Sequence, residues 1–358
     1  MTASPLFLDS YRLLGRSGLR VSPLALGAMT FGNDLGWGCE KAEAQQIFDH
    51  YVDCGGNFID TANVYTAGTS ERMVGEFAKG RRQRLVIGTK YSNCMDPGDP
   101  NSAGNHRKSM IQSVEASLKR LGTDYVDVFY LHAWDGRTGI EEVVRGFDDL
   151  VRQGKVLYPA LSDIPAWRAA QLQSYADLTR HVPFVAIQLE YSLLERSAEW
   201  DLMPMAAATG LAIMPWSPLG GGVLTGKYRP EDVAADGGAL SIVGKTRREL
   251  NLAQGKVTEH ALAIAAILKA IAQDCETTPA AVALAWVLAR EDVAAPVLGA
   301  RTVSQLEQNL AALSFTLTAE QRTRLDEASA IPPPWPHSML QLDYQQWQLA
   351  GGTQVAKR

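Results

Sequence analysis

The sequence predicts a (β/α)8 TIM barrel, and three features of the chain support this. Short apolar runs rich in β-branched residues recur eight times and alternate with helical patterns, which is typical of repeated βα units and a parallel sheet. The length of 358 residues suits a single large domain of this kind. Polar residues that could carry chemistry follow several of the apolar runs, and a barrel places such positions at one mouth.

The predicted strands and helices follow one another along the chain. The strands end near Gly27, Ala62, Lys90, His132, Ser162, Tyr191, Ser217 and Gly299. The helices occupy about 41–53, 70–79, 106–121, 140–153, 165–176, 198–208, 278–290 and 302–312, with further helices at 257–273 and 318–329. Pro159 and Pro215 fall inside predicted strands, where each removes a ladder donor, so we expect a bulge or a widened rim at both.

Segments outside the repeated units complete the predicted architecture. A hairpin at 11–22 is expected to cap the amino-terminal end of a single barrel domain at 11–330. The interval from Ser217 to Gly299 is about twice the others, and its glycine-rich first part, 219–255, is expected to be a mobile loop over the mouth.

The C-terminal tail, 331–358, begins at the helix-breaking run IPPPWP. Its aromatic residues are expected either to roof the barrel mouth or to form a contact in a homo-oligomer: Trp335, Tyr344 and Trp347.

The composition narrows the classes of partner. A net charge of -5 with 46% hydrophobic residues gives no reason to expect a nucleic acid or an anionic membrane, so a small molecule is the expected partner. The four cysteines show no CxxC spacing, and the N-terminus lacks a signal-peptide pattern, which predicts a cytoplasmic protein with reduced thiols. The longest apolar stretches, 261–268 and 280–289, are too short to span a bilayer.

Four residues near three successive strand ends are the candidate catalytic group: Asp60, Tyr65, Lys90 and His132. A phenol gives up its proton near neutral pH only if a nearby cation lowers its pKa from about 10, and a carboxylate can hold that cation charged. The four types together therefore suit carbonyl reduction without a metal. The alternative is a buried Asp–Lys pair beside a packed tyrosine and histidine. A metal-dependent barrel hydrolase is disfavoured, since no histidine pair has ligand spacing near the strand ends.

The motifs around these residues resemble those of the aldo-keto reductases, in family order over about residues 11–315. They read YRLLGRSGLRVSPLALG, GGNFIDTANVY, LKRLGTDYVDVFYLH, AIQLEYSLLER, WSPLGGGVLTGKY and VLGARTVSQLEQNLAAL. The resemblance is to the aryl-alcohol dehydrogenase-like and potassium-channel β-subunit-like branches. It implies an NADPH-dependent oxidoreductase that reduces aldehydes or ketones to alcohols, with Tyr65 as proton donor, Lys90 lowering its pKa and Asp60 holding Lys90 charged. A nucleotide-binding regulatory subunit with little turnover is the alternative.

A hydride donor is needed, because the candidate side chains cannot supply one. No GxGxxG follows the first strand, which argues against a Rossmann domain. The glycines at 220–222 follow the seventh strand, where barrels bind phosphates, although a flexible turn explains them as well. Arg301 precedes a predicted helix start, where the helix dipole disfavours a cation unless an anion is near; a surface salt bridge is the alternative.

The family resemblance assigns cofactor contacts for NADPH or NADP+ to a further set of residues. It implies nicotinamide contacts from Ser162, Asp163, Gln188 and Trp216, and pyrophosphate contacts from Ser217, Leu219 and Gly221. Arg301 and Gln305 are implied for the 2'-phosphate, Asn309 for the adenine, and Gly299 at the strand end before them. Asp163 departs from the usual asparagine, and an ionised aspartate only accepts hydrogen bonds. Core packing is the alternative for Trp216.

Three aromatic residues in loops after the first and fourth predicted strands are expected either to line an apolar substrate pocket or to pack within their loops: Phe31, Trp37 and Trp134.

Overall fold

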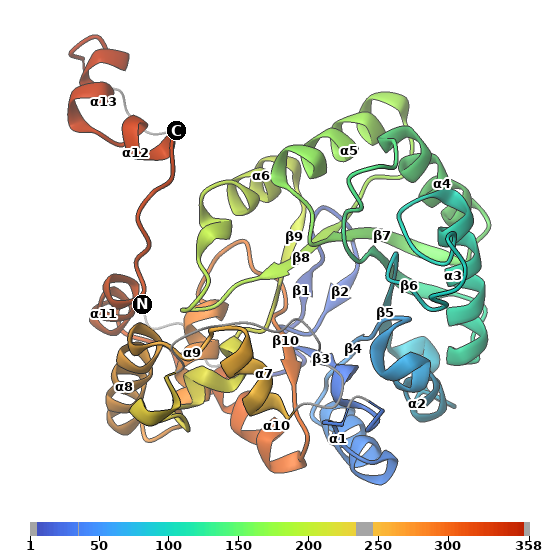
Figure 1. The fold of residues 1–358 in the computed structure, drawn as a ribbon, viewed down its shortest axis with the longest axis horizontal. Helices are drawn as coiled ribbons and strands as arrows, with labels where there is room; N and C mark the ends of the chain where they lie inside the picture. The colour runs from blue at the N-terminus through green and yellow to red at the C-terminus, as the bar shows by residue number, and fades with distance from the viewer. Residues whose placement is uncertain (1–5, 35, 234–245, 354–358) are drawn as a thin grey trace.

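The computed structural model describes residues 6–34, 36–233 and 246–353, which form a parallel barrel (Figure 1). Its eight strands are β3 (Ala25–Gly27), β4 (Phe58–Asp60), β5 (Val86–Tyr91), β6 (Val126–Leu131), β7 (Val156–Ser162), β8 (Ala186–Glu190), β9 (Ala212–Trp216) and β10 (Val297–Gly299). They pair in chain order, with β10 against β3. The Ile213 carbonyl accepts from the Ala294 amide at 2.9 Å, which brings β9 beside the chain entering β10. The predicted (β/α)8 barrel is confirmed.

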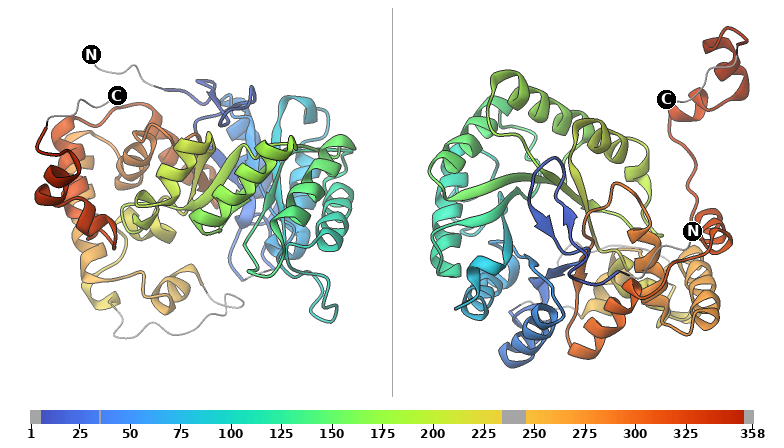
Figure 2. Two further views of the ribbon diagram at one scale, coloured as in Figure 1. Left: turned by 90° about the horizontal axis from the view of Figure 1, so that it is seen from above. Right: turned by 180° about the vertical axis from the view of Figure 1, so that it is seen from behind.

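Helices surround the barrel, as Figures 1 and 2 show. Those that follow the strands are α1 (Lys41–Asp53), α2 (Thr69–Phe77), α3 (Arg107–Leu121), α4 (Ile140–Arg152), α5 (Ala166–Thr179), α6 (Leu202–Thr209), α9 (Pro279–Leu288) and α10 (Val303–Leu310), with α8 (Glu259–Asp274) and α11 (Ala319–Ala328) as additional helices. Four of the later helices start where a threonine hydroxyl accepts from the backbone amide three residues on, which satisfies a free donor of the first turn: Thr258, Thr278, Thr302 and Thr318.

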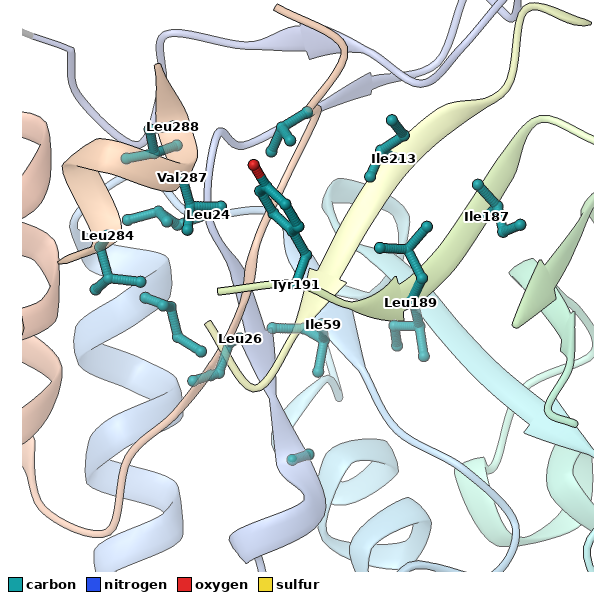
Figure 3. Packing of buried hydrophobic residues seen from close by; sticks show 14 of the residues in the cluster. Leu24, Leu26, Ile59, Ile187, Leu189, Tyr191, Ile213, Leu284, Val287 and Leu288 are labelled. Carbon is teal, nitrogen blue, oxygen red and sulfur yellow. The ribbon is translucent and has the colours of Figure 1, made fainter. Parts of the chain in front are cut away.

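Two apolar layers hold the barrel together. The larger layer lies between strands and helices, where Leu284, Val287 and Leu288 of α9 pack toward Leu24 and Leu26 (Figure 3). A second cluster fills the barrel interior, since alternate residues of each strand point inward; it includes Phe58, Val86, Val128, Tyr130, Ala186 and Met214.

The N-terminal hairpin joins the interior cluster from one end. It pairs β1 (Arg12–Leu13) with β2 (Arg20–Val21) in antiparallel fashion. Leu14 and Val21 are fully buried in the cluster with Phe58 and Val86, so the hairpin caps the amino-terminal end of the barrel as predicted. The opposite end, where the strands finish, is left for the candidate site.

The two strand prolines occupy regular positions. Pro159 pairs with Phe129, and Pro215 pairs with Leu189, with unbroken register on both sides. The expected bulges are therefore absent. Proline removes a donor but keeps its acceptor, and the Pro159 carbonyl accepts from the Val185 amide at 3.0 Å, so the pairing of β7 with β8 survives.

The segment after β9 contains η5 (Gly220–Thr225), η6 (Pro230–Asp232) and α7 (Arg247–Ala253). The sequence did not predict α7, although its start carries a capping box in which Thr246 and Glu249 bond each other's backbone amides. Residues 234–245, part of the loop predicted to be mobile over the mouth, lie outside the described residues.

The tail forms two short helices, α12 (His337–Leu340) and α13 (Asp343–Leu349), which project away from the barrel (Figures 1 and 2). His337 contacts Asp201 at 3.2 Å and tilts against the Trp200 ring. Trp335 and Trp347 are 78% and 61% exposed, so the roof and oligomer contact remain predictions. No helix in the described part of the chain is long and apolar enough to cross a membrane.

Candidate active site

The four candidate catalytic residues come together at the carboxyl end of the barrel. Asp60 ends β4, Lys90 lies in β5, and His132 directly follows β6. Tyr65 begins the turn η2 (Tyr65–Gly68), five residues after Asp60. The parallel register of β4, β5 and β6 places these strand ends side by side, as the sequence predicted.

The Lys90 ammonium is fully buried, and its three protons have three acceptors. Its Nζ lies 2.6 Å from Asp60 Oδ2, 2.8 Å from the Thr61 carbonyl oxygen and 3.4 Å from the Tyr65 hydroxyl. The Tyr65 oxygen therefore accepts from Lys90, which leaves the phenol's own proton to donate elsewhere.

The environment keeps Lys90 charged and Tyr65 protonated. Burial lowers the pKa of Lys90, but Asp60 and Tyr65 raise it, and the net direction is upward. Burial raises the pKa of Tyr65, Lys90 lowers it and Asp60 raises it, and here the net direction is also upward. Lys90 therefore acts on the pKa of Tyr65 in the expected downward direction, but burial raises this pKa by more. At neutral pH Tyr65 holds its proton.

Gln188 ties β8 to this group across the barrel. Its Nε2 donates to Asp60 Oδ1 at 2.9 Å, so both carboxylate oxygens of Asp60 are bonded. The family resemblance predicted only a cofactor role for Gln188, and no spacing signal pointed to Asp60. Ser162, paired with Gln188 in the register of β7 and β8, is 1% exposed at the same end of the barrel.

His132 stands at the edge of Tyr65. The two rings are 5.8 Å apart at 81°. Burial, and then the Lys90 charge, lower the pKa of His132 to about 3, so the imidazole is neutral. Ser92 fixes the backbone here, because its Oγ accepts from the His132 and Ala133 amides at 3.1 and 3.2 Å.

Asp163 and Trp216 form a pair at the ends of β7 and β9. The Trp216 Nε1 donates to Asp163 Oδ1 at 2.9 Å, which fixes the indole. Burial raises the pKa of Asp163 and the bond from Trp216 lowers it, with a net upward shift. The backbone is strained here, since Asp163 and Ser217 have φ of 41° and 49°, and Thr66 and Ala67 beside Tyr65 have 46° and 50°.

The predicted phosphate-binding turn follows β9. Gly220, Gly221 and Gly222 have φ of 56°, 65° and 89°, a run that side-chain-bearing residues rarely adopt. Asn251 of α7 holds the turn by donating to the Gly221 carbonyl at 2.9 Å. Ser217 and Leu219, also predicted contacts, stand directly before the turn and are partly exposed.

Three cations gather near this turn. Burial and then repulsion from Arg301 and Arg247 lower the pKa of Lys227. Burial and Arg301 lower the pKa of Arg247, Tyr228 and Glu190 raise it, and the net direction is downward. None of the three forms an ion pair with a carboxylate in the described ranges of the chain. Arg247 and Lys227 were missed by the sequence reasoning. Such a group without an ion-paired carboxylate fits an anion such as a phosphate.

The other adenosine-side candidates hold the chain around Arg301. Gln305 Oε1 accepts from the Arg301 amide at 3.0 Å, and Asn309 Nδ2 donates to the Gly299 carbonyl at 3.4 Å. Gly299 and Arg301 are exposed, whereas Asn309 is 5% exposed.

The three pocket candidates separate in the structure. Phe31 is fully buried and packs on the edge of Phe77 at 6.2 Å, so its ring belongs to the core, which corrects the pocket prediction. Trp37 is 7% exposed and lies under Arg247 at 5.1 Å, beside the cation group. Trp134 is half-buried after β6, with its amide on the Asp163 carbonyl, and remains a candidate wall of the substrate pocket.

A cavity of about 250 Å³ lies beside the site and does not contain the catalytic residues. Ile187 and Leu189 line it, and they alternate along β8 with the inward-facing Gln188, so the cavity is on the outer side of the barrel wall. Within the described residues, no group of three His, Cys, Asp or Glu side chains could hold a metal ion.

Comparisons with known proteins agree with this architecture. A sequence model of the aldo/keto reductase family matches residues 23–330. The chain is 36% identical to norsolorinic acid reductase of Aspergillus flavus, over 94% of this chain and 85% of that protein. It is 37% identical to an aryl-alcohol dehydrogenase of Pestalotiopsis microspora, covering 93% and 85%. It is 36% identical to the aryl-alcohol dehydrogenase [NADP(+)] of Phanerodontia chrysosporium, covering 89% and 86%. The chain belongs to the aldo/keto reductase family of oxidoreductases.

Proposed function

We propose that the protein is an NADPH-dependent reductase that converts aldehydes or ketones into alcohols, with Tyr65 as the proton donor. The main support for this proposal is the environment of Lys90. Its ammonium donates hydrogen bonds to Asp60, to the Thr61 carbonyl and to the Tyr65 hydroxyl. This arrangement leaves the hydroxyl proton of Tyr65 free to bond a substrate oxygen, while the Lys90 ammonium lies beside the Tyr65 oxygen.

The residues divide the work of reduction. NADPH, when bound, supplies the hydride to the carbonyl carbon. Tyr65 gives its proton to the carbonyl oxygen as negative charge develops there. Lys90 stabilises the phenolate that this transfer leaves behind, and Asp60 keeps Lys90 in place. His132 is neutral and donates one hydrogen bond to the same substrate oxygen.

Features of the chain fit NADPH rather than NADH. Arg301, Arg247 and Lys227 supply positive charge and form no ion pair with a carboxylate in the described residues, and the glycine turn lies beside them. We assign Arg301 to the 2'-phosphate, with Gln305 holding its backbone. Trp216, fixed by Asp163, offers a face for stacking on the nicotinamide, and Ser162 and Gln188 lie at the same mouth.

The substrate class follows from the mouth and the relatives. Trp134 and Trp216 are aromatic surfaces at the ends of β6 and β9, and relatives are named aryl-alcohol dehydrogenase and norsolorinic acid reductase. We therefore propose aromatic aldehydes and ketones as the substrates. We also propose that the protein acts in the cytoplasm. A screen of such compounds, and of the matching alcohols with NADP+, tests this by NADPH absorbance. Absence of turnover with every compound, while NADPH binds, would favour the regulatory-subunit alternative.

Replacing Tyr65 by phenylalanine removes the proton donor and little else. In Tyr65→Phe we expect kcat for aldehyde reduction to fall by about 10²- to 10⁴-fold. NADPH affinity, measured by fluorescence titration, should stay within about twofold. Tyr11→Phe, at the hairpin end of the barrel, is the matched control and should keep full activity. Full activity in Tyr65→Phe would remove Tyr65 from the mechanism.

The pH dependence follows from the directions of the pKa shifts. Because the pKa of Tyr65 is raised above 10 and that of His132 is lowered to about 3, neither group titrates between pH 6 and 9. The proton donor is present below the pKa of Tyr65 and is lost as pH rises through it. We expect single-turnover reduction to be flat from about pH 6 to 9, and alcohol oxidation, which needs the phenolate, to rise with pH. A reduction midpoint near pH 7 would contradict this.

Arg301 should distinguish the two nicotinamide cofactors. In Arg301→Ala the loss of one charge-assisted phosphate contact, about 1.5 to 3 kcal/mol, should weaken NADPH binding by roughly tenfold to a hundredfold. NADH binding should barely change, because NADH has no 2'-phosphate. Arg84→Ala, an exposed change near the start of β5, controls for net charge. Equal losses for both cofactors in a fluorescence titration would reject the assignment.

Asp163 should favour the oxidised cofactor. Its carboxylate lies beside the indole proposed to face the nicotinamide, which is positive only when oxidised. Asp163→Asn keeps an oxygen that can accept from Trp216 but removes the charge. We expect NADP+ to bind about threefold to tenfold more weakly relative to NADPH, a Coulomb effect reduced by solvent screening. An unchanged ratio of the two dissociation constants would show that the charge does not reach the ring.

A further inference from the structure

Asn93 contacts one of the two ring nitrogens of His132. Its Nδ2 lies 3.2 Å from His132 Nδ1. Asn93 lies three residues after Lys90. The backbone carbonyl oxygen of Asn93 accepts from Asn63 Nδ2 at 3.4 Å. The Asn63 amide in turn donates to the Lys90 carbonyl at 3.2 Å, so the loop after β5 is bonded to the loop after β4.

The proton of a neutral imidazole sits on one ring nitrogen, and the partner of the other nitrogen decides which. The Asn93 amide nitrogen carries two protons and can only donate. A donor at Nδ1 requires a lone pair there, which puts the ring proton on Nε2. Only that tautomer lets His132 donate from Nε2 to a substrate oxygen.

We propose that Asn93 is a positioning residue for carbonyl reduction, holding His132 in the tautomer that carries its proton on Nε2. This rests on the proposed function, in which His132 donates a hydrogen bond to the carbonyl oxygen. Asn93 itself touches neither the catalytic Tyr65 nor the ammonium of Lys90 in any hydrogen bond of the described residues.

The titratable groups around His132 do not by themselves determine which ring nitrogen carries the proton. Tyr65 faces the ring from the loop after β4, and Lys90 faces it from β5 with Asp60 behind. Asp163 lies farther round the mouth and acts on Tyr65. Of these groups, none makes a hydrogen bond to His132 Nδ1 within the described residues, which leaves Asn93 as the partner that selects the protonated nitrogen.

The sharpest test replaces Asn93 by its acidic near-isostere. In Asn93→Asp the group facing Nδ1 only accepts, so the ring proton should move to Nδ1 and leave Nε2 bare. We expect kcat for reduction at pH 8 to fall by about 10²- to 10³-fold, as for loss of one oxyanion donor. Activity should recover as pH falls, because the new carboxylate favours the imidazolium, which carries protons on both nitrogens.

Two further variants separate this role from folding and from charge. Asn93→Leu removes the donor without adding an acceptor, so it should lose about tenfold or less in kcat and keep a flat pH profile. Asn101→Asp makes the same charge change at an exposed position of the same loop and should behave as wild type. A comparable acid-side recovery in Asn101→Asp would overturn the proposal.

The tautomer can be read without any activity. Long-range proton–nitrogen NMR of the imidazoles, with His132 identified by its absence in His132→Gln, should show Nε2 protonated in the wild type and Nδ1 protonated in Asn93→Asp. A wild-type ring protonated on Nδ1, or no exchange between the two variants, would overturn the proposal. A clear tautomer exchange with unchanged kcat would reject His132 as a donor in the proposed function and would overturn the positioning role of Asn93 in carbonyl reduction.

Discussion

The site depends on keeping an ion pair buried at the mouth of the barrel. Removing Lys90 and Asp60 from water costs several kcal/mol per ion, and attraction offsets this only if the remaining hydrogen bonds are satisfied. Here all three Lys90 donors and both Asp60 oxygens have partners. The last partner, Gln188, comes from β8, so the ion pair is complete only when the barrel has formed around it. Fold and chemistry are coupled through these bonds.

How much the sequence could predict follows from where each contact is made. The convergence of residues at the strand ends could be predicted, because a parallel barrel places successive strand ends at one mouth. Asp60, Lys90 and His132 follow that rule. The hydrogen bond from Gln188 to Asp60 could not be predicted, since it joins residues 128 apart on strands that are not neighbours. Phe31 could not be assigned, because a loop aromatic reads the same whether it faces the mouth or, as here, Phe77.

The insertion after β9 shows a second limit of local reasoning. The glycines at 220–222 could be identified from the sequence. Arg247 and Lys227 could not, because only the fold brings them close to this turn and to Arg301. Arg247 comes from α7, whose capping box is a local signal, while its approach to Arg301 depends on how the insertion folds back. Trp37 under Arg247 adds a contact from the loop after β3, so three distant segments build the region proposed to bind a phosphate.

The raised pKa of Tyr65 agrees with its proposed role once the transition state is considered. A phenol made acidic in the resting protein would lose its proton to solvent before the substrate arrived. Burial prevents this, while Lys90 at 3.4 Å remains a modest hydrogen-bond donor to a neutral oxygen. When the proton leaves, the same pair becomes two opposite charges, with an attraction of about 5 kcal/mol at an effective dielectric near 20. Stabilisation that grows only as the reaction proceeds lowers the barrier, which is the advantage of placing the cation beside a buried phenol.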